Sequence, residues 1–317
     1  MALLTLLLSI FTFVELNTEN LFDTQHDSLK NDTEFLPDSY HYWNNARYWR
    51  KLNHIGQEII ACGGDSAGWT LPDMVALCEV ENDTVMRDLT KRSLLRKARY
   101  EYIMTNSPDE RGIDVALMYS PFAFRPINHH SIRIQPIKNM RPTRDILYVS
   151  GLLIDDDTLH VFVVHAPSRS GGEVHSRPFR MAVAERLMAS VDSIRVLSPR
   201  VRIIVAGDFN DYVGDKSLMY IGERGLQDVS ENVIGMHGAK GTYRYKGKWG
   251  SLDHIFCSLS MQLLLDSCYI FDAPFLLTDD EKYGGLQPRR NFNGGQYNNG
   301  FSDHLPLIAR FRVGVEE

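Results

Sequence analysis

Apolar runs of strand length recur along the whole chain. Runs of this kind, bounded by polar or turn residues, are typical of buried β-strands. The runs are Phe11–Leu16, Met74–Cys78, Val115–Tyr119, Leu147–Ile154, Leu159–Val164, Val201–Ala206, His254–Ser258, Ser267–Phe271 and Leu305–Val313. We therefore expect a core built largely from β-sheet.

Segments with helical spacing of apolar residues lie between these runs. The clearest extends over Arg177–Leu197, where apolar residues recur on one stripe. A shorter helix is expected over Leu52–Ile59. Another is expected from Val85, with Asn82 and Asp83 just before it as candidate N-caps. Strands and helices mix, and both hairpin-like and crossover connections are present. This pattern favours an α/β sandwich, with two packed sheets inside and helices outside.

Two long segments have no regular pattern. Gln25–Tyr40 is polar, and Thr278–Gly300 is rich in glycine and asparagine. Loops of this length in a compact domain are usually functional or disordered. Because the second segment leads directly into Ser302-Asp303-His304, we expect it to face substrate. The alternative is a surface excursion.

Polar residues with catalytic chemistry stand at the ends of the apolar runs. In some runs the polar residue comes after the last apolar residue, and in other runs it comes before the first. If these two groups of strands are antiparallel, all the polar residues meet at one rim of the sandwich. The residues are Asn17, Glu79, Asp114, His165, Asp208, Asn210, Asp253, Asp303 and His304.

This rim is rich in oxygen ligands. Glu79, Asp208, Asp303, Asn17 and Asn210 suit Mg²⁺, or Mn²⁺, whereas zinc would require clustered His or Cys. Glu81 competes with Glu79 for the same role.

Each of the two histidines has a candidate acidic partner, Asp114 for His165 and Asp253 for His304. A carboxylate on one ring nitrogen selects the tautomer and supports the imidazolium. A metal ion, carboxylates and two oriented histidines fit hydrolysis of a phosphate ester. The chain has no GxSxG, SxxK, P-loop or GxGxxG motif.

Several arginines are candidates for binding substrate phosphate, because a guanidinium donates two parallel hydrogen bonds to an anion. Some lie after His165 at the start of the long helix, where the alternative is a solvated helix end. Others lie in the glycine-rich segment, near Tyr283 and Tyr297. The candidates are Arg111, Arg169, Arg177, Arg289 and Arg290.

Composition limits these expectations. The chain has 317 residues, 44% of them hydrophobic and 23% charged, with a formal net charge of −6. This balance is ordinary for a globular protein and argues against a broadly basic surface for nucleic acid. The four cysteines show no metal-ligand spacing, so we expect buried thiols, with a Cys257–Cys268 disulfide as the alternative.

The first residues, Met1–Ile10, are apolar and too few to cross a bilayer as a helix. We interpret them as the remnant of an export signal or as an extension, with one catalytic domain over residues 11–317. The protein is exported or periplasmic if the segment is a signal, and otherwise cytoplasmic. We expect a monomer without a transmembrane helix.

The motifs N-x-x-N-L-F, E-x-E-N, R-G-I-D, H-x-P-S-R, G-D-F-N, S-L-D-H and S-D-H occur in this order. Their order resembles the endonuclease/exonuclease/phosphatase superfamily, the deoxyribonuclease I-like fold, in a bacterial branch. The resemblance implies a four-layer α/β/β/α sandwich of two mixed sheets.

The same resemblance implies roles for the rim residues. Asn17 and Glu79 would bind the first metal ion, and Asp208 with Asn210 would orient the attacking water. Asp253 would support His304, and Asp303 would lie near the metal. His165, with Asp114, would be the second histidine of the nuclease and sphingomyelinase branches; the abasic-site branch has Tyr at this position. Many members carry Gln where this chain has Cys78.

Together these observations predict a Mg²⁺-dependent phosphoesterase that hydrolyses phosphodiester bonds by in-line attack of water, with a nuclease as the first expectation. The first alternative is a phosphatase or a phospholipase C-like enzyme that acts on lipid or small phosphate esters. The second is a binding module that has lost catalysis.

Overall fold

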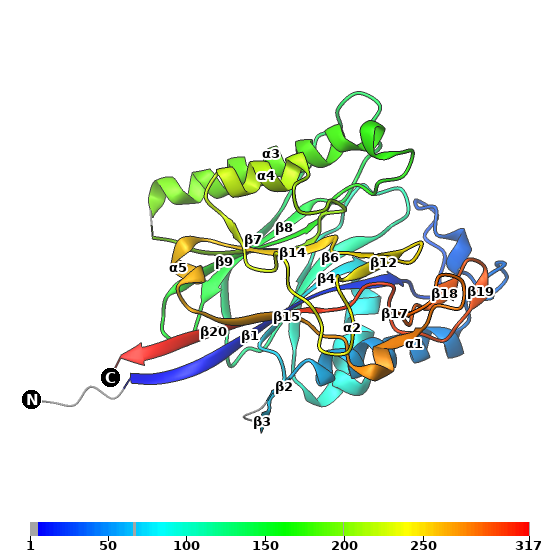
Figure 1. The fold of residues 1–317 in the computed structure, drawn as a ribbon, viewed down its shortest axis with the longest axis horizontal. Helices are drawn as coiled ribbons and strands as arrows, with labels where there is room; N and C mark the ends of the chain where they lie inside the picture. Colours follow the sequence, from blue (N-terminus) through cyan, green and yellow to red (C-terminus); the bar gives the residue numbers. More distant parts are fainter. Residues whose placement is uncertain (1–5, 66–67, 199, 317) are drawn as a thin grey trace, which may run out of the picture.

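Two mixed sheets lie face to face in the computed structural model, which describes residues 6–65, 68–198 and 200–316 (Figure 1). The first sheet has the order β15 (Leu265–Ile270), β20 (Leu307–Glu316), β1 (Leu6–Leu21), β4 (Met74–Val80), β6 (Asp114–Tyr119) and β5 (Glu101–Met104). The second has the order β11 (Gln227–Asp228), β14 (Asp253–Cys257), β10 (Arg202–Asp208), β9 (Thr158–His165), β8 (Ile146–Leu152) and β7 (Arg125–Ile132). All nine strands expected from the sequence are among them.

Helices cover the outer face of each sheet. In Figure 1, α3 (Glu173–Leu197) and α4 (Lys216–Glu223) lie above the sheets, and α1 (Asn45–Ala61) and α2 (Asp83–Lys91) lie below. One apolar core fills the space between the two sheets. A second core lies between the first sheet and its helices, and a third lies between the second sheet and its helices. The expected four-layer sandwich is therefore confirmed.

The remaining elements are short. Helix α5 (Leu259–Gln262) and 3-10 turns at Thr33–Phe35, Leu94–Lys97 and Pro274–Leu276 connect the strands. Four hairpins pair β2 (Gly64–Asp65) with β3 (Gly68–Trp69), β12 (Tyr243–Tyr245) with β13 (Lys248–Gly250), β16 (Leu277–Asp279) with β17 (Leu286–Pro288), and β18 (Phe292–Asn293) with β19 (Gln296–Tyr297).

Strand direction brings the polar ends to one rim, as the sequence pattern predicts. Strands β1 and β4 are parallel, and β20 and β6 run antiparallel to them. In the second sheet β9 and β10 are parallel and β14 is antiparallel, so that Asp208 pairs with both His165 and Asp253. Residues far apart in the chain thus become neighbours.

The N-terminal strand begins before the expected domain boundary at residue 11. Leu6–Ile10 continue β1 and pair with Arg312–Glu316 of β20. This part of Met1–Ile10 therefore belongs to the first sheet, because a continuous antiparallel ladder includes it. Residues 1–5 of that segment lie outside the described residues.

Local sequence explains the helix starts. The Asn44 side chain accepts hydrogen bonds from the first turn of α1, and Asn82 accepts from Val85 N in α2, as expected for N-caps. The four cysteines are free, so the alternative Cys257–Cys268 disulfide is not formed. Across the described part of the chain, every helix is too short or too polar to span a lipid bilayer.

Candidate active site

Asp208 lies at the centre of the rim, at the end of β10. Its Oδ2 accepts a hydrogen bond from Asn17 Nδ2 at 3.0 Å, which joins the two sheets. His165 Nε2 lies 3.7 Å from Asp208 Oδ2 and 3.8 Å from Glu79 Oε1. The structure therefore brings together four of the predicted residues, from β1, β4, β9 and β10.

Glu79, and not Glu81, is the glutamate of this group. Glu79 Oε2 accepts from Asn20 N at 2.8 Å, and its other oxygen faces His165. Glu81 instead accepts from Asp23 N at 2.7 Å, away from the histidines. The competition that the sequence leaves open is resolved in favour of Glu79.

His304 has the partner predicted for it. Its Nδ1 lies 2.7 Å from Asp253 Oδ2, and Thr242 Oγ1 donates to the same carboxylate oxygen at 2.5 Å. The ring of Tyr243 packs against the imidazole with a centroid separation of 4.8 Å. His304 is thus held by a buried acid on one side and an aromatic ring on the other.

His165 lacks the partner predicted for it, so the pairing with Asp114 is wrong. The Asp114 carboxylate accepts from Thr105 Oγ1, Ser107 N and Ser107 Oγ, and so holds the turn that follows β5. Within the described residues His165 Nδ1 has no hydrogen-bond partner. Asp114 lies at the predicted rim, but its carboxylate oxygens accept hydrogen bonds from Thr105 and Ser107 and not from His165.

The two histidines have opposite proton affinities. Burial lowers the pKa of His165 well below its usual value, and the charges of Arg144 and Arg111 lower it further. Burial also opposes protonation of His304, but the charge and hydrogen bond of Asp253 outweigh it and raise the pKa well above the usual range. Identical side chains at one rim therefore favour different protonation states.

Burial and the neighbouring Asp253 carboxylate raise the pKa of Asp208 to about 7. Ligand atoms of Asp208, Asp253 and His304 lie within 4.8 Å of one another, and Asp253 Oδ1 has no partner among the described residues. Crowded, buried carboxylates with incomplete hydrogen bonding fit a bound cation, which would offset their mutual repulsion. The donor set of the rim is therefore suited to a divalent metal ion.

The backbone at the site adopts conformations that non-glycine residues seldom take. Glu79 has φ 63° at a bulge in β4, and Asn210 has φ 51° directly after β10. Gly207 has φ 144°, and a Cβ there would approach Val164 O to 1.8 Å, so only glycine permits β10 to pair this closely with β9. Such strain is common at functional sites, where the surrounding structure maintains it.

A cavity of about 940 Å³ opens from the rim. Its lining includes Glu79, His165, Asp208, Asn210 and His304, together with loops 139–144 and 167–171. Tyr212, Tyr243 and Tyr245 add an aromatic wall. The cavity is large enough for a phosphate together with a substantial organic group.

The predicted phosphate-binding arginines separate into two groups. Arg111 and Arg169 line the cavity. Arg177 lies outside it and pairs with Glu173, and Arg289 lies over the ring of Phe301. Neither side chain lines the cavity, so the geometry does not support these two predictions.

Arg290 also lies outside the cavity lining, and it binds an acidic residue of the site. Its Nη2 binds Asp303 Oδ2 at 2.7 Å, so that it contacts a predicted metal residue and not the open space. No residue of Thr278–Gly300 lines the cavity. The expectation that this segment faces substrate is therefore wrong; it folds instead into small hairpins and contacts α1, where His54 Nδ1 lies 2.8 Å from Gly300 O.

Arg144 is a site residue that sequence reasoning missed. It is buried, binds Asp109 Oδ2 at 3.0 Å, and donates to the carbonyl oxygens of His165 and Ala166. It lies in a polar stretch before β8 with no motif around it, so no sequence signal marks it. Its contacts hold the chain directly after β9.

Comparison with known proteins gives the same fold. Residues 12–312 match the profile of the Endonuclease/Exonuclease/phosphatase family. A search of curated proteins found none that matches. Among solved structures, an endonuclease/exonuclease/phosphatase family protein from Bacteroides thetaiotaomicron is 16% identical with a TM-score of 0.62, covering 98% of this chain and 100% of that chain.

Two further structures are similar to this chain. TDP2 from C. elegans is 16% identical with a TM-score of 0.57, covering 96% of this chain and 75% of that chain. A mannosyl-6-phosphatase from Bacteroides thetaiotaomicron VPI-5482 is 15% identical with a TM-score of 0.59, covering 94% of this chain and 98% of that chain. At these identities the likeness shows the fold alone.

Proposed function

The chain belongs to the Endonuclease/Exonuclease/phosphatase family, and from this premise we propose that it is a divalent-metal-dependent phosphoesterase that cleaves phosphodiester bonds. One observation carries the proposal. Glu79, Asp208, His165 and His304, the last held by Asp253, line one cavity of about 940 Å³. Carboxylates with two histidines at the base of a cavity are suited to stabilising and protonating phosphoryl oxygens.

Glu79 and Asp208, with Asn17 and Asp303 nearby, would hold Mg²⁺ or Mn²⁺. We favour these oxygen donors over Asp253 and His304, whose facing atoms already bind each other. The metal ion would supply positive charge to the phosphoryl oxygens.

The chain's own residues supply the remaining steps. Asp208 and Asn210 orient the attacking water, and His304, held by Asp253, lines the same cavity. His165, 3.7 Å from Asp208 Oδ2, would contact a phosphoryl or departing oxygen. Arg111 is the cavity arginine whose guanidinium has no ion pair or hydrogen bond to the described residues, so it is free to bind a phosphate oxygen.

A second candidate, a phosphatase acting on small phosphate esters, is favoured by the state of the other arginines. Arg141, Arg144 and Arg169 also line the cavity, but each pairs with a protein carboxylate. With a net charge of −6, few free cations remain to follow a long nucleic acid backbone.

One panel of assays tests both candidates. Purified protein is incubated with Mg²⁺, with Mn²⁺ or with chelator. The substrates are a chromogenic phosphodiester, its phosphomonoester analogue, plasmid DNA, single-stranded DNA, RNA, sphingomyelin and sugar phosphates. Metal-dependent cleavage of diesters supports the proposal, and preference for monoesters supports the second candidate. Metal and phosphate binding with no turnover on any substrate would indicate a binding module.

A further inference from the structure

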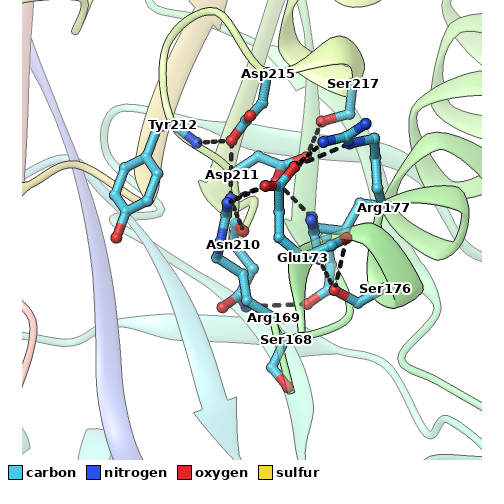
Figure 2. A network of polar contacts seen from close by, with 12 residues as sticks. Ser168, Arg169, Glu173, Ser176, Arg177, Asn210, Asp211, Tyr212, Asp215 and Ser217 are labelled. Carbon is cyan, nitrogen blue, oxygen red and sulfur yellow. Dashed lines mark hydrogen bonds and ion pairs between the residues drawn. The ribbon is translucent and has the colours of Figure 1, made fainter. Parts of the chain in front are cut away.

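Arg169 connects the two loops that border the candidate active site. It follows β9 in the loop after His165, and its Nη1 lies 2.8 Å from both Asp211 Oδ1 and Asp215 Oδ2 (Figure 2). The guanidinium lies over the ring of Tyr212, with its Cζ 4.9 Å from the centroid. One side chain therefore binds three residues of the segment that directly follows Asp208 and Asn210.

Asp211 anchors this network inside the protein. It is fully buried and also accepts from Arg180 Nε at 2.6 Å and from Ser217 Oγ at 2.5 Å. Arg180 extends from α3, and Ser217 lies in the first turn of α4. A buried carboxylate with this many donors fixes the position of its own backbone, because moving it would leave charges unpaired.

The network acts on the residue that precedes Asp211. Asn210 has φ 51°, a left-handed conformation that its neighbours must maintain. Its carbonyl lies 3.4 Å from Arg169 Nη1, and its side-chain amide donates to Ala166 O at 3.1 Å. The chain after β9 and the chain after β10 are thus tied together on both sides of Asn210.

We propose that Arg169 is a positioning residue that holds Asn210 and Asp208 in place by linking the 166–172 loop to Asp211 and Asp215. It forms ion pairs with Asp211, Asp215 and, at 3.6 Å, Glu173, so it acts through these carboxylates and not by binding substrate phosphate. This inference rests on the proposed function, but the geometry that it concerns is also measurable without substrate.

The experiment compares Arg169→Met and Arg169→Lys with a control, Arg195→Met. Arg195 also ties two segments, since its Nη2 donates to Gly225 O at 2.8 Å, but it lies outside the cavity lining. Three sets of measurements are made on each full-length variant. They are the kcat and KM on the best phosphodiester of the panel, the melting temperature, and hydrogen exchange in a peptide spanning residues 208–215.

We expect Arg169→Met to lower kcat roughly 10- to 100-fold with KM changed less than about threefold, because misplaced catalytic groups slow the chemical step. Exchange in the 208–215 peptide should rise while the melting temperature falls no more than in Arg195→Met. Arg169→Lys should recover part of kcat, since one ammonium binds one carboxylate but does not span both in the same geometry.

Two outcomes would overturn the inference. A rise in KM with normal kcat and unchanged exchange would make Arg169 a substrate-binding residue. Exchange and kcat equal to those of Arg195→Met would remove any special role. If the wild type cleaves no substrate in the panel, the proposed function fails, whereas the exchange comparison still decides whether Arg169 holds the loop.

Discussion

The two histidines of the candidate site stand on opposite sides of Asp208, in different surroundings. On the His304 side, Nδ1 is bound by buried Asp253, and Tyr243 covers the ring. On the His165 side, Nδ1 has no partner within the described residues, and the buried guanidinium of Arg144 binds the backbone carbonyl. One imidazole is stabilised as a cation, and the other as a neutral ring.

Position at the rim therefore does not determine the protonation state of a histidine. Both residues stand beside a strand end, and both are buried. What separates them is the balance of burial and charge: the charge and hydrogen bond of Asp253 outweigh burial at His304, whereas burial and the charges of Arg144 and Arg111 act together at His165. Groups with divergent proton affinities at one site commonly divide the acid and base work between them.

The residue that both sides share should show the largest effect. We expect Asp208→Asn to lower kcat by roughly 10³ or more, because the substitution removes a charge from the centre of the site while keeping its shape. Activity is measured with saturating metal ion, and folding by circular dichroism. Loss of the folded spectrum would assign Asp208 to structure, and near-normal turnover would contradict the site itself.

Removing each histidine separately tests whether both sides take part. His304→Ala and His165→Ala should each lower turnover on the order of 10²- to 10⁴-fold. Asp253→Asn should reproduce part of the His304 loss, because it keeps the hydrogen bond geometry and removes the charge. Near-wild-type rates in both alanine variants would eliminate a two-histidine mechanism.

A buried acid away from both histidines, Glu58, should make the stability of the protein depend on pH. Burial raises the pKa of Glu58 in α1 to about 8, and its carboxyl oxygens lack partners in the described part of the chain. A raised carboxyl pKa means that the folded state binds a proton that the unfolded state has released, so stability falls as pH rises from about 4.5 towards 8. Glu58→Gln should remove this slope.

The comparison is made by urea unfolding at several pH values. Wild type and Glu58→Gln should be similar at pH 5, and above pH 8 the variant should be more stable by on the order of 2–4 kcal/mol. A parallel loss of stability in both proteins would show that other groups cause the slope. The variant also provides a flatter background for measuring pH effects of the two histidines.

The smallest effect on turnover is expected at Asp114. Because its carboxylate binds Thr105 and Ser107 and not His165, Asp114→Asn should change kcat less than about fivefold while lowering stability by roughly 1–3 kcal/mol. Steady-state kinetics and thermal melting measure the two effects. A loss as large as that of His165→Ala would restore the pairing that the structure contradicts.

Much of the fold follows from local pattern. The run that ends at Asp208 is a strand because its apolar residues alternate between two packed faces, and the run that begins at Asp253 pairs with it. Strands β5, β7 and β11 lack such a run and were not expected. Edge strands need fewer apolar residues, so their pattern is weaker.

The site likewise contains residues that the sequence pattern predicts and one that it does not. Glu79, His165, Asp208 and His304 stand directly at strand ends, where position in the strand determines position in space. Arg144 lies in irregular chain, and only the tertiary fold brings its guanidinium to the carbonyl of His165.

The apolar pattern alone predicted nine strands, the long helix, two packed sheets with helices outside, and the residues of the rim, because periodicity and strand ends are local properties. The four-layer order was implied by the family resemblance. The tertiary structure alone decided which partner each side chain binds. It gave Asp114 to the turn after β5, Arg290 to Asp303 and Arg169 to Asp211. Hydrogen bonds and ion pairs depend on distances of a few ångströms between distant segments, which spacing along a chain does not encode.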